Sequence, residues 1–156
     1  MLDQVLSEIP IFQNLERLQL YELNSWLVRK DVAAGDVILK QGAPTDGLYV
    51  LAKGAADVFA HGDGQDIRIA TLQAPSVIGE MGVLINEPRT AEVRATEASI
   101  LGFLPQELLE EKLKENNITA LRIALTLGRI ATLRLRTTTR KLLDLTQQHS
   151  DETLHV

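Results

Sequence analysis

The chain contains no cysteine, and it has only three histidines among its 156 residues. Without thiols it can form neither disulfides nor iron–sulfur clusters, and it cannot use cysteine as a nucleophile. The histidines, His61, His149 and His155, are far apart, and two of them lie in a polar C-terminal stretch. Because a histidine-based metal or haem site needs several converging ligands, we expect no metal and no such cofactor.

Long hydrophobic runs are also missing. No apolar stretch approaches the ~18 residues of a membrane-spanning helix, and the N-terminus MLDQVLSEIP lacks the basic start and apolar core of a secretion signal. Apolar residues make up 45% of the chain and charged residues 24%, which is typical of a globular protein. The sequence predicts one soluble, cytoplasmic domain with no membrane partner.

Positive charge is scarce overall, and the net charge of −5 disfavours nucleic acid as a partner, because binding phosphates needs a basic surface. The distribution is uneven, however. Every charged residue between Thr119 and Leu143 is basic. This stretch is explained either by a solvated helix face or by a basic face for a partner or for an acidic surface of the barrel, and these interpretations stay open.

The middle of the chain is divided by turn residues into short β-rich runs. From Val28 to Leu104 these include VILK, LYVLAKG, ADVFA, IRIATL, AEVRA and SILGFL, separated by glycine, proline, aspartate and asparagine. Such spacing is typical of a compact antiparallel barrel or sandwich. Helical spacing precedes it over residues 2–29, with a break at Pro10, and PQELLEEKLKEN follows it as a helix with Pro105 in its first turn. The predicted class is α+β.

A long helix is predicted from about residue 117 to 145, capped by Asn116 or Asn117, with 146–156 as a polar tail. Its apolar residues form two stripes, and each needs something to pack against. One stripe can lie on the strands and the other on a second copy of the helix, giving a homodimer; alternatively, the helix packs entirely within its own domain. The first stripe is a coiled-coil-like seam of Leu121, Leu125, Gly128, Thr132, Leu135, Thr139 and Leu142, and the second is Ile123, Leu127 and Ile130.

The stretch IGEMGVLINEPRTA, residues 78–91, holds the candidate site. Gly79 permits a close approach of the backbone, and the residues after it can form a short helix whose first N–H groups attract anions. Pro88 fixes the chain before Arg89, whose guanidinium can bind a phosphate, while the Glu80 carboxylate can accept a bond from a ribose hydroxyl. A simple ion pair between Glu80 and Arg89 is the competing explanation.

This stretch resembles the phosphate-binding cassette of the cyclic-nucleotide-binding domain family, in which a Gly-Glu pair and a short apolar helix precede Pro-Arg-Thr-Ala. The resemblance covers about residues 1–145. It includes IPIFQNL at 9–15, Gly35, Gly42 with Asp46, LYVL at 48–51, Gly54 and the closing helices. It implies a jelly-roll-like antiparallel β-roll of about eight strands at about 28–104, flanked by N-terminal helices and the long C-terminal helix.

The resemblance also implies the site. Arg89 is expected to hold the cyclic phosphate of the ligand, and Glu80 its ribose 2′-hydroxyl. Replacement of Arg89 by leucine is expected to weaken binding at least about a hundredfold without affecting folding. The remaining sugar-phosphate contacts are expected from Gly79, Met81, Thr90 and Ala91.

The base of the ligand is expected to lie between the β-roll and the long helix. Alignment with the sensor domain of catabolite activator protein places Thr138 and Thr139 where that protein has base-contacting hydroxyls. Thr90 can donate to a guanine or to the phosphate. We favour cyclic AMP over cyclic GMP as the ligand. The two possible roles of Thr90 leave the base preference open.

Two departures from the family pattern are visible. Pro75 to Ile78 stand where relatives carry a Gly-Asp-x-Phe sequence, which changes the loop before Gly79. Only about ten polar residues follow the long helix, so the chain as given is expected to lack a helix-turn-helix domain and not to bind nucleic acid. The predicted function is a non-enzymatic sensor; the alternative is a structural or oligomerisation module with an empty pocket or another effector.

Overall fold

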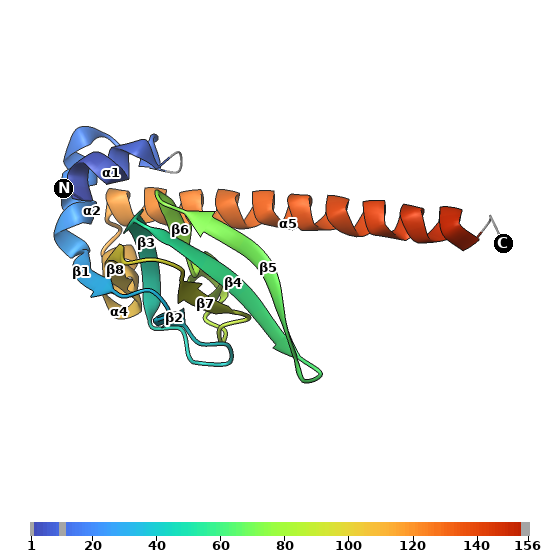
Figure 1. The fold of residues 1–156 in the computed structure, drawn as a ribbon. Coiled ribbons are helices and arrows are strands. Elements are labelled where there is room, and N and C mark those ends of the chain that lie inside the picture. Colours follow the sequence, from blue (N-terminus) through green and yellow to red (C-terminus); the bar gives the residue numbers. More distant parts are fainter. Residues whose placement is uncertain (1, 10–11, 154–156) are drawn as a thin grey trace.

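The computed structural model describes residues 2–9 and 12–153. In this part of the chain, antiparallel strands form a β-roll with helices along one side (Figure 1). The predicted α+β class, β-roll, N-terminal helices and long C-terminal helix are confirmed. The predicted break at Pro10 and the last residues of the predicted tail, 154–156, lie outside the described residues.

The β-roll consists of two four-stranded antiparallel sheets. The first has the order β1 (Val28–Val32), β8 (Ser99–Pro105), β3 (Gly47–Lys53), β6 (Ser76–Ile78). The second has the order β2 (Val37–Leu39), β7 (Glu92–Ala95), β4 (Ala55–Gly62), β5 (Gln65–Gln73). Among the described strands, β5 is therefore an edge strand that pairs with β4.

Strand β3 shows how the layers are held together. Because successive side chains of a strand point to opposite faces, Leu48 and Val50 join a core beneath the helices, while Tyr49 and Leu51 join a second core inside the roll. All of these side chains are buried. The first sheet is thus covered on both faces, by helices on one and by the second sheet on the other.

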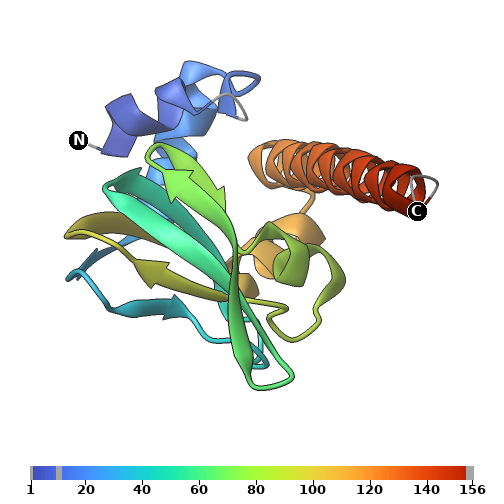
Figure 2. The same cartoon turned by 45° about the vertical axis from the view of Figure 1, so that its right-hand side comes forward.

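The helices cover the outer face of the first sheet, as Figure 2 shows from a second direction. They are α1 (Leu2–Glu8), α2 (Arg17–Trp26), α4 (Gln106–Lys114) and α5 (Ile118–Thr153), while the short α3 (Glu80–Ile85) lies between β6 and β7. None of the helices in the described part of the chain has both the length and the apolar character needed to cross a bilayer.

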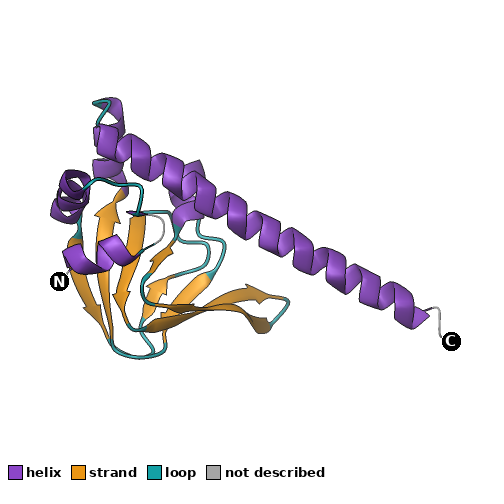
Figure 3. Cartoon of the chain, turned by 90° about the horizontal axis from the view of Figure 1, so that it is seen from above, coloured by secondary structure: helices purple, strands orange, loops and turns teal. Residues whose placement is uncertain are grey.

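Helix α5 is fixed on α2 at its start, and its later part projects from the roll. The Asn117 side chain caps it by accepting a hydrogen bond from the backbone of Ala120 (3.0 Å), as predicted. Glu22 of α2 accepts further bonds from Asn117 (2.7 Å) and Thr119 (2.6 Å). Beyond residue 131 each described side chain up to His149 is exposed, and the helix projects past the strands (Figure 3).

The two predicted stripes of α5 differ in burial. Ile123, Leu127 and Ile130 are buried in the core under the helices, as one stripe was expected to be. The leucines of the other stripe, the α5 seam, are exposed: Leu121, Leu125, Leu135 and Leu142. The helix also runs to Thr153 rather than ending near 145, because nothing in QQHSDET interrupts it.

Candidate functional site

A cleft of about 700 Å³ lies between the β-roll and α5. This volume is in the range of about 300–1,000 Å³ found for small-molecule sites. One end is polar and is formed by the segment from Gly79 through α3 and by the residues before β7. The middle is apolar, with walls of Leu39, Val58, Ile69, Leu72, Ile78 and Val93.

Gly79 makes the turn into the polar end. Its φ of +87° lies in the left-handed region, which side chains rarely adopt. A Cβ at this position would also come within 2.5 Å of the Arg89 guanidinium. A residue other than glycine would therefore strain the turn and displace Arg89.

Arg89 is buried, and its partners come from distant parts of the chain. Its Nη1 donates to the carbonyl oxygen of Gly79 (3.0 Å). Its Nη2 donates to the carbonyl oxygen of Gly47 (2.6 Å) and to Asp46 Oδ1 (2.9 Å). The simple ion pair of Arg89 with Glu80, considered from the sequence, is not formed among the described residues. Arg89 instead joins the start of β7 to β3 and to the turn before α3.

Asp46 is held in turn by Tyr49, whose hydroxyl donates to Asp46 Oδ2 (3.3 Å). Burial of the phenol, together with the neighbouring Asp46 carboxylate, raises the pKa of Tyr49 to about 12. The hydroxyl therefore keeps its proton at neutral pH and remains a donor to Asp46. This contact fixes the carboxylate that orients Arg89.

Glu80, the first residue of α3, is 1% exposed and pairs with Arg134 of α5. Glu80 Oε1 makes this ion pair without a hydrogen bond of good geometry. Arg134 also donates to the carbonyl oxygen of Val77 (3.0 Å). A carboxylate of the site is thus neutralised by the helix that covers the site.

The structure brings most of the predicted site residues together. Thr138 of α5 lies at the helical side of the cleft. Thr139 does not reach the cleft: its hydroxyl donates to Leu135 O within α5 (2.9 Å), and it lies with Leu135 and Arg136 on another face. The other predicted residues that line the cleft are Gly79, Glu80, Met81, Arg89, Thr90 and Ala91.

Four further cleft residues on α5 were not predicted as site residues: Leu133, Arg134, Thr137 and Lys141. Arg134, Thr138 and Lys141 are spaced four and three residues apart, so they share one face of the helix. Once Thr138 is assigned to the cleft, this spacing identifies the other two. This spacing is visible in the sequence, but it identifies Arg134 and Lys141 only when the face of α5 that meets the cleft is known.

The segment before Gly79, where the family pattern is lost, is a regular strand. Ser76, Val77 and Ile78 form β6, which pairs with Leu51, Val50 and Tyr49 of β3. The altered sequence therefore still delivers Gly79 and Glu80 to the edge of the cleft.

Comparison with known proteins agrees with this geometry. The sequence model described as "Cyclic nucleotide-binding domain" matches residues 29–116. The cAMP-dependent protein kinase regulatory subunit of Blastocladiella emersonii is 37% identical over 95 residues, which are 60% of this chain and 24% of that protein. The corresponding type II regulatory subunit of Drosophila melanogaster is 30% identical over 72% of this chain and 30% of its own length. The chain thus spans less than a third of either relative.

Among solved structures, Thermus thermophilus catabolite activator protein has a TM-score of 0.77 and 27% identity, over 88% of this chain and 63% of that one. A cyclic nucleotide-binding domain from Methylobacillus flagellatus KT has a TM-score of 0.80 at 21% identity, over 92% of this chain and 81% of its own. The second likeness is one of fold alone.

Proposed function

The chain belongs to the cyclic nucleotide-binding domain family, and from this we propose that it is a non-enzymatic regulatory sensor that binds a cyclic nucleotide in the cleft beneath α5. The observation that carries the proposal is the division of the cleft. A buried guanidinium and a buried carboxylate stand at one end, and an apolar slot leads from them towards hydroxyls on α5.

Arg89 is proposed to bind the cyclic phosphate. Three of its N–H groups are used by Gly79, Gly47 and Asp46, so the Nε–H and one Nη1–H remain for an anion. The protein contacts hold the guanidinium in place before the ligand arrives, which lowers the entropy lost on binding. Backbone groups of Gly79 and Met81, with Thr90 and Ala91, complete this end of the proposed site.

Glu80 is proposed to accept a hydrogen bond from the ribose 2′-hydroxyl. In the ligand-free chain its carboxylate is paired with Arg134. A ribose that uses the same carboxylate either displaces Arg134 or joins it, and both change the contact that holds the middle of α5. Ligand binding is in this way coupled to the position of the helix.

The base is proposed to lie in the apolar slot with Thr138 at its edge, and cyclic AMP is favoured over cyclic GMP. Thr138 can donate to a ring nitrogen or accept from an exocyclic amine, as adenine requires. Thr139 does not take part in this contact within one copy of the chain, because it points away from the cleft.

A homodimer through the α5 seam is part of the proposal. The exposed leucines Leu121, Leu125, Leu135 and Leu142 occupy four of the seven positions of the seam, on a helix that projects from the roll. Burying them against a second copy removes apolar surface from water.

The test is calorimetric titration of the wild-type chain with cyclic AMP, cyclic GMP and 5′-AMP, combined with melting curves. We expect cyclic AMP to bind tightest and 5′-AMP far more weakly, with bound ligand raising the melting temperature by mass action. Failure of both cyclic nucleotides to bind at millimolar concentration would refute the sensor function. A preference for cyclic GMP would refute only the choice of base.

A further inference from the structure

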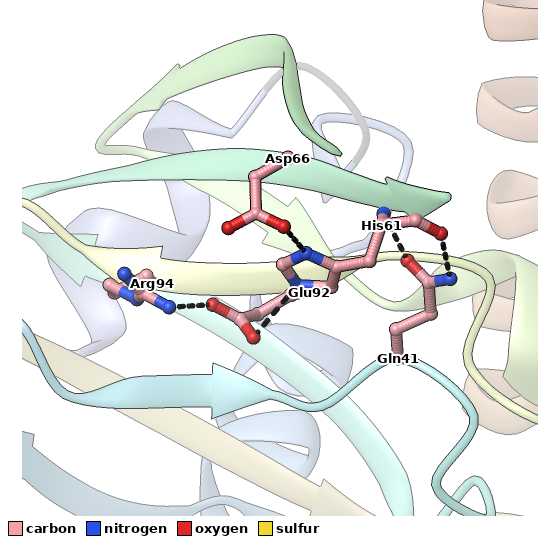
Figure 4. A network of polar contacts seen from close by, with 5 residues as sticks. All are labelled: Gln41, His61, Asp66, Glu92 and Arg94. Atoms are coloured by element: carbon pink, nitrogen blue, oxygen red, sulfur yellow. Dashed lines mark hydrogen bonds and ion pairs between the residues drawn. The ribbon is translucent and has the colours of Figure 1, made fainter. Parts of the chain in front are cut away.

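A second polar cluster lies around His61, near the tip of the β4–β5 hairpin (Figure 4). His61 Nδ1 lies 2.5 Å from Asp66 Oδ1 of β5, and His61 Nε2 lies 3.0 Å from Glu92 Oε2 of β7. Arg94 forms an ion pair with the other carboxylate oxygen of Glu92. The imidazole thus bridges two carboxylates from the strands on either side of β4.

Only the charged form of His61 can satisfy both contacts. A neutral imidazole has one N–H donor and one bare nitrogen, so one carboxylate would face an acceptor. The imidazolium donates from both nitrogens. The hydrogen bonds to Asp66 and to Glu92 accordingly raise the pKa of His61. Farther along the hairpin, Arg68 and Asp57 (3.7 Å) form a separate pair.

The cluster is connected to Arg89 by two short routes. Glu92 begins the strand that follows Arg89. In addition, the Gln41 side chain accepts from the His61 backbone N–H (2.8 Å) and donates to the His61 carbonyl (2.9 Å). The next residue, Gly42, donates its N–H to the carbonyl oxygen of Arg89 (2.8 Å).

The hairpin held by His61 is also a wall of the cleft. Val58 of β4 and Ile69 and Leu72 of β5 line the apolar slot. The ladder between β4 and β7 ends at the pair Phe59–Glu92. Beyond that pair, the side-chain contacts of His61 take the place of backbone pairing in holding the hairpin to β7.

We propose that His61 is a positioning residue whose positive charge sets the affinity of the cleft for its cyclic nucleotide, so that binding weakens as the pH rises. The proposal rests on the proposed function. A histidine whose pKa is raised on folding contributes fully below its ordinary value, about 6.5, and the contribution is lost as the pH rises through the higher folded value. The hairpin then loosens on β7, and the apolar wall and the Arg89 segment are less well fixed.

The experiment measures the dissociation constant of cyclic AMP from about pH 6 to about pH 8.5 for the wild type, His61→Gln and a matched control, His149→Gln on the distal part of α5. We expect the wild type and control to lose affinity about threefold over this range, the scale of one partly exposed ion pair. His61→Gln should be flat and as weak as the wild type at high pH, because glutamine cannot carry the charge. NMR titration of the His61 ring should show a pKa above the ordinary value, lowered by Glu92→Gln.

Parallel pH profiles in the wild type and His61→Gln, with clear binding in both, would overturn the role of His61 and leave the sensor function standing. A His61 ring that titrates below its ordinary value would overturn it as well. Absence of binding at every pH would instead refute the proposed function, and this inference with it.

Discussion

Replacement of Arg89 by leucine is expected to weaken both the fold and the ligand site. From the sequence alone we expected the fold to be unaffected. In the structure, Arg89 is 5% exposed and satisfies the carbonyl groups of Gly47 and Gly79. Removing the guanidinium takes this donor from Gly47 O and leaves Gly79 O only a long bond from the Val83 N–H (3.5 Å), and each lost contact costs about 1–3 kcal/mol. The ion pair with Asp46 adds less than about 1 kcal/mol, because the Asp46 side chain is 59% exposed. The expected loss of stability is about 2–7 kcal/mol.

Urea unfolding of the ligand-free protein measures this loss, and calorimetry at low temperature measures cyclic AMP binding by the fraction that remains folded. Removing the guanidinium should weaken binding at least about a hundredfold, or about 2.7 kcal/mol. Asp46→Asn is the matched control. It removes the exposed carboxylate and leaves Arg89 with both carbonyl contacts, so its stability should change by less than about 1 kcal/mol.

Two results would refute this reasoning separately. An Arg89→Leu protein that is folded and binds cyclic AMP within about threefold of the wild type would exclude Arg89 from phosphate binding. An unchanged unfolding midpoint would show that the carbonyls of Gly47 and Gly79 find other partners, and that the contacts of Arg89 do not stabilise the fold.

Three further predictions follow from α5. The losses of unfolding free energy caused by Glu80→Gln and Arg134→Met should be non-additive in urea unfolding, with a coupling of about 1–3 kcal/mol, because Glu80 is buried while Arg134 is 42% exposed. Additive losses would contradict the ion pair. Thr138→Val should weaken cyclic AMP binding about threefold to tenfold, whereas Thr139→Val should leave the affinity unchanged if the site is formed by one copy of the chain. Weaker binding by Thr139→Val would indicate that a second copy supplies the Thr139 hydroxyl to the site. Leu135→Glu should convert a dimer to a monomer in sedimentation with no loss of folding, and a monomeric wild type would exclude the dimer.

Local sequence predicted those parts of the site that depend on neighbours in the chain. Gly79 before an acidic residue and Pro88 before Arg89 predict a turn, a short helix and a strand start, and the structure has all three. The buried stripe of α5 follows in the same way from helical spacing, because the 3.6-residue period decides which side chains face the core.

The partners of the two charged residues could not be predicted in this way. Arg89 pairs with Asp46, and Glu80 pairs with Arg134, in each case across tens of residues of intervening chain. Such contacts depend on how sheets and helices pack. The sequence could not show which of Thr138 and Thr139 lies at the cleft, for a geometric reason. Adjacent residues of an α-helix are about 100° apart around its axis, so an alignment error of one residue places the wrong threonine on the cleft side of α5.

The two anchors of α5 limit how a ligand could move it. Contacts of Glu22 with Asn117 and Thr119 fix the start of the helix on α2, whereas Arg134, in the middle of α5, contacts Val77 and Glu80. A change at Glu80 therefore acts on the distal half, which carries Leu135 and Leu142 of the exposed seam. A ligand shifts this half only to the extent that it binds one helix position more tightly than the other. If the Glu80–Arg134 coupling is about 1–3 kcal/mol, the ratio of the two helix positions can shift by about 5- to 150-fold, enough to regulate a partner that binds the seam.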